Sequence, residues 1–365
     1  MKARRERLWI ILGAAAFGLQ ALFGRDSALA EKVYSRGLFV AFRWGWDYTF
    51  GLAPIPCLYL FTAALALFLG FRWIRHLTRP GNKMRVPALK RAGRFLLAAA
   101  GWAGRLVFFF YLLWGFNYNR VGLSKQMGIE PAPLTRADLA NETAWASSIS
   151  AEARAAVPGA SSNVLGKDAL PSGLESVLRE AMTGILRQAG YPAPGRVRVR
   201  SFVPGGWMMR FSSTGVYIPY FGEAYTASNL LPHEKPFTMA HEMAHGFGIT
   251  DEGEAGFLAF LACRAAADPM ARYSGCVGYW EYAAGELARV DPQAFRALWA
   301  GLPGGMKADV RAAELNAARF RGVIDKVSRK VYGKYLESQG IEDGISSYSR
   351  FVGLVAAWKR KNAGT

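Results

Sequence analysis

The sequence is poor in cysteine and histidine. It contains three cysteines and four histidines in 365 residues, and no two cysteines form a C-x-x-C pair. Three cysteines are too few for a disulfide framework. Cys263 and Cys276 could pair outside the cytoplasm, but we expect two small buried thiols. A metal site in this chain would therefore depend on histidine and carboxylate side chains.

Acidic residues are scarce in the first third of the chain. Residues 1–116 contain 17 of the 45 Lys and Arg but only 4 of the 27 Asp and Glu, so most of the formal net charge of +18 lies there. The basic residues flank apolar runs, which is typical of membrane topology. The chain also lacks a nucleotide-binding glycine loop and a recognisable nucleic-acid reading motif. We therefore expect a membrane protein that binds no nucleic acid.

Three apolar runs predict membrane helices at about residues 8–23, 52–71 and 95–116. The segment Ala28-Leu29-Ala30 resembles a small-residue cleavage site, so the first run is either a retained helix or a signal peptide. We favour the retained helix because further runs follow. Arg105 lies near the middle of the third run and faces either a helix bundle or, by snorkelling, a headgroup.

The charge of the loops predicts the topology. Between the second and third runs the sequence has eight basic residues and no acid: Arg72, Arg75, Arg79, Lys83, Arg85, Lys90, Arg91 and Arg94. By the positive-inside rule this loop is cytoplasmic. The chain after residue 116 is then expected on the extracytoplasmic side.

Residues 239–248 contain an H-E-x-x-H motif. His241 and His245 are four residues apart, so on a helix they share a face and can bind one zinc ion. Glu242 lies beside the first ligand, where it can take a proton from a water held by the zinc. The motif specifies only three positions and also occurs by chance, but half of the histidines of the chain lie in it.

A catalytic zinc site needs a third protein ligand. We expect Asp251 to be the N-cap of a second helix, which ends at about Ala267. On that helix Glu254 shares a face with apolar residues, and a buried carboxylate needs a cation, so we choose Glu254 as the third ligand. Glu252, about 200° around the helix, is the alternative. Both acids could instead complement the positive end of the helix dipole.

Alternating apolar residues before the motif predict a small β-sheet. Val197 and Val199 alternate with arginines, and residues 214–220 follow. Pro219 favours an edge strand, which can pair with an extended substrate; alternatively, this is a hairpin that covers the core. The predicted fold class is α+β, with three N-terminal transmembrane helices and a mostly helical domain. The expected divisions are a membrane anchor (1–116), a connector (117–173) and a catalytic domain (174–365).

Several segments carry a family resemblance: residues 114–120 (WGFNYNR), 215–224 (GVYIPYFGEA), 236–257, 272–275 (RYSG), and 335–336 with 343–348. They resemble a bacterial family of membrane-anchored, zinc-metallopeptidase-like proteins that is catalogued as a domain of unknown function. The family pattern has Asn where Gly256 stands here, which affects a contact beside the metal and not the ligands. The resemblance implies a zincin-like domain without a known substrate. The segment at Glu254 also resembles that of gluzincin-type peptidases, which implies that this acid ligates zinc.

The sequence thus predicts a multi-pass zinc metallopeptidase of the bacterial inner membrane, acting outside the cytoplasm on a peptide or protein. His241, His245 and Glu254 would hold one Zn²⁺, and Glu242 would be the general base. A further group must stabilise the oxyanion. The candidates for it are Tyr273, Tyr279, Tyr348 and His233. The alternative functions are a zinc-containing envelope scaffold without turnover and a hydrolase of cell-wall amides.

Overall fold

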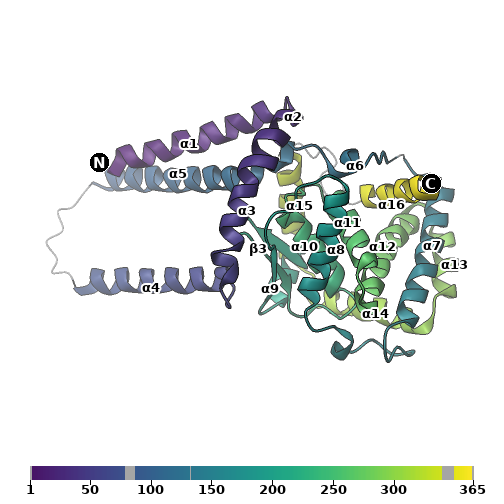
Figure 1. Ribbon diagram of the computed structural model, residues 1–365. Helices are drawn as coiled ribbons and strands as arrows, with labels where there is room; N and C mark the ends of the chain where they lie inside the picture. The colour runs from purple at the N-terminus through teal and green to yellow at the C-terminus, as the bar shows by residue number, and fades with distance from the viewer. Residues whose placement is uncertain (1, 79–86, 132, 339–348, 364–365) are drawn as a thin grey trace. The chain divides into compact units, whose positions relative to one another are not determined.

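The chain forms two compact units in the computed structural model, which describes residues 2–78, 87–131, 133–338 and 349–363 (Figure 1). The first unit comprises residues 1–120 and the short segment 219–223. The second comprises residues 121–218 and 224–365. The predicted connector, 117–173, therefore falls largely within the second unit.

Three helices of the first unit are long and apolar enough to cross a membrane: α1 (Lys2–Phe23), α4 (Cys57–Thr78) and α5 (Ala88–Leu113). The three predicted runs are thereby confirmed as candidate spans, with different limits. The second helix begins at Cys57 because Pro54 and Pro56 precede it, and a residue before proline avoids helical backbone angles. The third begins earlier than predicted, directly after Pro87.

Helices α1 and α5 lie side by side (Figure 1). Their backbones approach closely at two glycines, where a Cβ on Gly13 would lie 2.6 Å from the carbonyl oxygen of Gly104. Small residues permit such close packing between membrane helices. The helices run in the same direction, because Trp9 contacts Gly104, and Phe17, farther along α1, meets Tyr111, farther along α5.

Arg105 of α5 faces α1. Its Nη1 donates a hydrogen bond of 2.7 Å to the carboxylate of Glu6, and its guanidinium lies over the ring of Trp9. A charge within an apolar helix is expensive unless it is paired in this way. The structure thus favours the first of the two interpretations of Arg105.

Short helices complete the first unit: α2 (Ser27–Leu29), the π-helix η1 (Ala30–Leu38), α3 (Phe39–Asp47), and the 3-10 helices η2 (Phe50–Leu52) and η3 (Gly115–Asn119). Charged side chains are buried here in pairs. Arg120 donates to Glu31 over 2.9 Å, and Arg43 pairs with Asp47. Because each charge is paired, the interior holds no isolated charge at these positions. An isolated buried charge would be strongly destabilising.

Residues 219–223 belong to the first unit although they link two strands of the second. The ring of Phe221 packs on Phe61 of α4, with centroids 5.5 Å apart. The carboxylate of Glu223 accepts a hydrogen bond of 2.9 Å from the backbone N–H of Cys57, the first residue of α4. Glu223 therefore satisfies one of the unpaired N–H groups at the beginning of that helix.

The second unit is mostly helical. Its helices are α6 (Leu123–Gln126), α7 (Arg136–Ala155), the 3-10 helix η4 (Lys167–Ala169), α8 (Leu174–Gln188), α9 (Gly206–Arg210), α10 (Lys235–Gly246), α11 (Glu252–Ala265), α12 (Pro269–Val290), α13 (Pro292–Gly301), α14 (Gly304–Ala318), α15 (Val323–Ser338) and α16 (Ser349–Ala363). Helix α7, within the predicted connector, packs along α12 and contributes Leu139 and Ala146 to the core.

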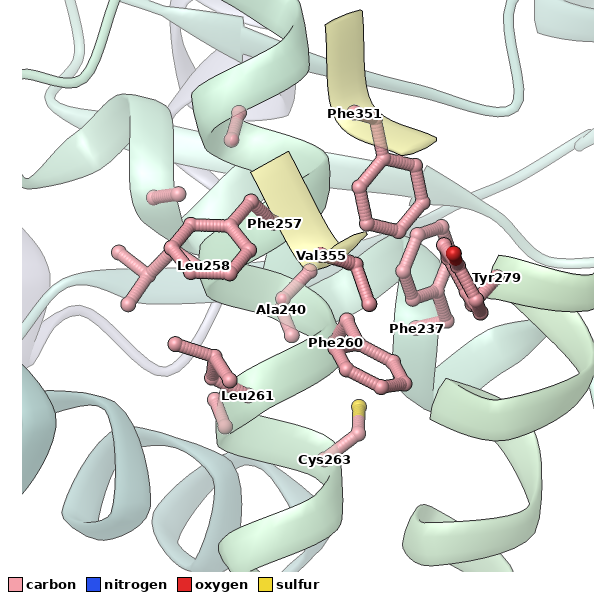
Figure 2. Close-up of a cluster of buried hydrophobic side chains, with 14 of the residues drawn as sticks. Phe237, Ala240, Phe257, Leu258, Phe260, Leu261, Cys263, Tyr279, Phe351 and Val355 are labelled. Atoms are coloured by element: carbon pink, nitrogen blue, oxygen red, sulfur yellow. The ribbon is translucent and has the colours of Figure 1, made fainter. Parts of the chain in front are cut away.

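Helix α11 is the centre of the core. Each residue from Glu252 to Cys263 is buried, and the helix packs against α8, α10, α12 and α16. Figure 2 shows Phe257, Phe260 and Leu261 of this helix among side chains of α10, α12 and α16. A helix that is apolar on all sides is stable only when it is surrounded.

A three-stranded sheet precedes the motif helix, as predicted. Its strands are β1 (Arg198–Phe202), β2 (Gly215–Ile218) and β3 (Glu223–Ala227), in the order β1-β3-β2. Strand β2 is thus an edge strand, and Pro219 follows it directly. Helix α10 packs against both β1 and β2, so the sheet lies next to the H-E-x-x-H motif.

Candidate metal centre

Helix α10 carries both histidines of the motif. Pro236 stands in its first turn, where a missing N–H costs nothing, and the helix is buried along most of its length. After its end Gly248 adopts φ +87°, a left-handed conformation that favours glycine and lets the chain turn towards α11. His241 and His245 are both buried and one helical turn apart, with ring centroids 4.9 Å from each other.

Glu252 completes a cluster with these two histidines. The donor atoms of His241, His245 and Glu252 lie within 4.8 Å of one another. His241 Nε2 is 3.0 Å from Glu252 Oε2, His245 Nε2 is 3.5 Å from the same oxygen, and the two Nε2 atoms are 3.2 Å apart. Ligand atoms of a tetrahedral zinc ion, about 2.0–2.2 Å from the metal, are separated by roughly 3.3–3.6 Å. The three donors therefore fit one such ion after small adjustments.

A further hydrogen bond orients His245. Its Nδ1–H donates to the carbonyl oxygen of Ile249 over 2.8 Å, which fixes the ring with Nε2 towards His241 and Glu252. Burial alone lowers the pKa of His245, but the carboxylates of Glu252 and Glu242 and the carbonyl group of Ile249 together outweigh burial and raise this pKa to about 9. Burial likewise opposes ionisation of Glu252, yet the two imidazoles hold its pKa well below the usual range. The cluster thus favours a cation among its donors.

Glu254 lies elsewhere, contrary to the sequence prediction of the third ligand. Its carboxylate accepts hydrogen bonds from the backbone N–H groups of Leu123 (2.8 Å) and Ser124 (2.9 Å), and from the hydroxyl of Ser124 (2.7 Å). It therefore caps the beginning of α6. Asp251 is the N-cap of α11, as predicted, but the acid that faces the histidines is Glu252. We expected the buried carboxylate of Glu254 to need a cation. Three hydrogen-bond donors stabilise it instead.

Glu242 is buried between the histidines and strand β2. Burial raises the pKa of its carboxyl group, and the imidazoles of His245 and His241 oppose this increase. Gly215, the first residue of β2, touches the glutamate so closely that a Cβ there would lie 2.5 Å from Glu242 Oε1. The sequence offered no signal for this role of Gly215, because the contact depends on how α10 packs against the sheet.

A family model described as "Protein of unknown function (DUF3810)" matches residues 34–356. The chain belongs to this family. The match includes α4 and α5 of the first unit and the helices α10 and α11 that carry the metal cluster. No curated protein and no solved structure matches the chain. The expected membership of a family of unknown function is thereby confirmed, and the chemistry of this DUF3810 protein has to be inferred from its site.

Two of the predicted oxyanion-stabilising residues have buried acids as the partners of their hydroxyl groups. The hydroxyl of Tyr273 donates to Asp309 over 2.9 Å, and that of Tyr279 donates to Glu142 over 2.8 Å, both in the core. Tyr348 lies outside the described residues. His233 precedes α10 and lies near the ring of Tyr273. These contacts indicate structural roles for Tyr273 and Tyr279.

Tyr282 of α12 is a tyrosine that the sequence did not single out. Its ring packs against Phe237 and Phe351. Burial raises the pKa of its hydroxyl, and the carboxylates of Glu252, Glu281 and Glu242 add to the increase. Two of these carboxylates belong to the site. One tyrosine among fifteen gives no sequence signal, since only the packing of α12 beside α10 brings it here.

Because His233 is buried, we expect the folded chain to lose stability in acid. The side chain is 1% exposed, and neither ring nitrogen has a hydrogen-bond partner in the described part of the chain. Burial lowers its pKa from 6.5 to about 4, so the unfolded chain binds the proton more tightly than the folded one. The free energy of unfolding that depends on neutral His233 is therefore fully present above pH 6.5. It falls by about 3 kcal/mol as the pH drops to 4.

The measurement is the unfolding midpoint of the full chain between pH 7.5 and pH 4, for the wild type and His233→Gln. We expect the variant to lose less stability over this interval. His76→Gln, at an exposed histidine of α4, is the matched control and should follow the wild type. Equal pH dependence in all three proteins would contradict a buried neutral His233.

Proposed function

We propose that this protein is a membrane-anchored zinc metallopeptidase. The observation that supports the proposal most directly is the cluster of His241, His245 and Glu252, whose donor atoms lie within 4.8 Å of one another, with Glu242 following the first histidine in the chain. Two imidazoles and one carboxylate leave a fourth tetrahedral position for water or substrate, which is the composition of catalytic zinc sites. A structural site would have no need for Glu242.

In the proposed mechanism the three ligands hold the metal and Glu242 moves protons. When bound, zinc supplies a Lewis acid that polarises a carbonyl group and lowers the pKa of water. Glu242 accepts a proton from the attacking water and later donates it to the leaving amine. Burial of Glu242 suits both steps, because it raises the pKa of the carboxyl group towards the operating pH.

Strand β2 supports a peptide as the substrate. It is an edge strand, and Gly215 at its beginning touches Glu242. An extended peptide can add to an exposed sheet edge through backbone hydrogen bonds. A small sheet that precedes an H-E-x-x-H helix, with the acid ligand on the next helix, also supports a zincin-like domain. Tyr282 is our candidate for stabilising the oxyanion, because its ring packs against Phe237, which in turn packs against His241.

The proposed location is the bacterial inner membrane, with the metal centre outside the cytoplasm. Three apolar helices support the association with a bilayer. The basic loop between α4 and α5 supports a cytoplasmic position for that loop by the positive-inside rule. An odd number of spans then leads the second unit to the opposite side.

The test is cleavage by the full-length protein in lipid nanodiscs after loading with zinc. It is incubated with a mixed-sequence peptide library, and mass spectrometry detects new peptide ends. We expect cleavage that a chelator abolishes and added zinc restores. Purified cell-wall material forms a second arm, in which released peptides would indicate an amide hydrolase. A folded, zinc-loaded protein that is inactive in both arms would favour the scaffold.

A further inference from the structure

Two neighbouring elements of the second unit expose large apolar side chains. The connection between β1 and β2 exposes Val203, Trp207 and Phe211, and helix α15 exposes Val323, Ile324, Val327 and Val331. Trp207 is 62% exposed and Val323 is 79% exposed. A contiguous group of such side chains is uncommon on a soluble surface and usually marks an interaction site. We call these seven residues the apolar patch.

The two parts of the apolar patch are held together. Helix α15 packs against α9, which carries Trp207. The hydroxyl of Ser328 donates a hydrogen bond of 2.8 Å to the carbonyl oxygen of Phe211. At the other end of α9, Gly206 lies against Phe320, so closely that a Cβ would be 2.5 Å from the ring. The patch is therefore one surface and not two separate apolar spots.

Basic side chains border the apolar patch. Lys326, Lys330 and Lys334 are exposed and recur every four residues along α15, as do Val323, Val327 and Val331. Lysine and valine stripes at this spacing lie next to each other, because Lys326 and Lys330 each lie about 60–100° around the helix from the nearest valines. Arg210 of α9 is also exposed. The charged side chains that the structure describes as exposed on α9 and α15 are thus basic.

We propose that the apolar patch and its basic border dock on a lipid bilayer that carries anionic headgroups. Helices of this kind lie in the membrane interface with their apolar side chains among the acyl chains, while lysines extend to the phosphates. Tryptophan prefers the same depth. The apolar helices of the same chain tie the patch to a bilayer, so lipid is present at high effective concentration.

Docking would make the second unit a surface-bound domain, so its site would meet substrates near lipid. The inference does not depend on the metal. A protein that binds zinc and cleaves peptides without docking, or docks without cleaving, would separate this proposal from the proposed function.

The experiment measures the depth of single labels in the full chain. Trp207→Cys and Val327→Cys carry an environment-sensitive fluorophore, and Val290→Cys, at an exposed valine of α12 outside the patch, is the matched control. The native cysteines are buried, and labelled wild type measures their background. Each protein is reconstituted into nanodiscs of phosphatidylcholine alone or mixed with phosphatidylglycerol. Lipids with spin labels on the acyl chains serve as quenchers.

We expect a blue shift and quenching at positions 207 and 327, stronger with phosphatidylglycerol, and neither at position 290. Each lysine near an anionic surface contributes about a fivefold factor in binding. Replacing Lys326, Lys330 and Lys334 by Glu should therefore lower the ratio of docked to undocked protein more than tenfold. Raised salt should weaken docking in the wild type.

Quenching at positions 207 and 327 no greater than at position 290 would overturn the proposal. Energy transfer between labelled copies without lipid quenching would also overturn it, because the patch would then bind a second copy. Labels already shielded in lipid without phosphatidylglycerol, and unaffected by the lysine substitutions, would show that anionic headgroups are not recognised. Equal unfolding midpoints of variants and wild type confirm that the labelled proteins are folded.

Discussion

Glu252→Gln is expected to lose zinc, whereas Glu254→Gln is expected to keep it. Glu252 Oε2 lies 3.0 Å and 3.5 Å from the Nε2 atoms of the two histidines, so a neutral amide there removes both a ligand and the negative charge. Loss of an outer contact to a metal ligand already costs about 10–100-fold in affinity, so loss of a ligand should cost at least about 100-fold. The measurement is zinc per chain at controlled free zinc, for full-length protein.

Glu254→Gln is the matched control, two residues away on the same helix. It should bind about one zinc per chain, as the wild type does. Its expected defect is in stability. The N–H groups of Leu123 and Ser124 donate to different oxygens of the carboxylate, so an amide nitrogen would face one of them. The loss of such charge-assisted hydrogen bonds lowers the free energy of unfolding by about 1.5–3 kcal/mol.

His245→Ala completes the set, since it removes a histidine ligand and should abolish tight binding. Loss of zinc from a folded Glu254→Gln protein, together with retention by Glu252→Gln, would contradict the assignment and return Glu254 to the site. A folded wild-type protein that binds no zinc would remove the metallopeptidase proposal altogether.

Glu242→Gln should slow turnover strongly while leaving zinc in place. Glutamine has nearly the same shape, so the packing against Gly215 is kept, but it cannot accept and return a proton. General acid–base catalysis contributes about 10²–10⁴-fold, and kcat should fall by a factor in that range. The measurement is peptide cleavage under single-turnover conditions, with zinc content determined on the same samples. Unchanged cleavage would contradict the role of Glu242.

Gly215→Ala tests the geometry of the same carboxylate. The added Cβ would lie 2.5 Å from Glu242 Oε1 and must displace it. A displacement of about 1 Å at a reacting group can cost about 100-fold in rate. Zinc should remain, because the ligands are untouched. Gly285→Ala is the control, since its added Cβ has no atom within 4 Å. Equal losses in both variants would indicate a general effect of alanine.

These variants also distinguish a catalytic function from that of a scaffold without turnover. If cells that produce only Glu242→Gln behave like the wild type, and the variant keeps its zinc, then turnover is not the function of the protein. A defect in cells that matches the loss of cleavage would support the peptidase.

The sequence by itself determined the features that depend on short-range patterns. The apolar runs predicted α1, α4 and α5, since crossing a bilayer requires about twenty apolar residues in succession. The spacing of His241 and His245 predicted their shared helix face, because a helix repeats every 3.6 residues. Only the ends of the apolar helices differed, where Pro56 and Pro87 set the beginning of α4 and α5.

The tertiary structure alone decided which acid joins the histidines. Sequence reasoning assigned Glu254 to a buried face because apolar residues share that face. Each residue from Glu252 to Cys263 is buried, however, so the pattern of α11 has no exposed side by which to orient the helix. Its rotation is set by the helices packed around it, and this turns Glu252 to the histidines and Glu254 to α6. Helix packing also brings Gly215 to Glu242, and Tyr273 and Tyr279 to buried acids. The sequence could not predict these contacts, because they join residues far apart in the chain.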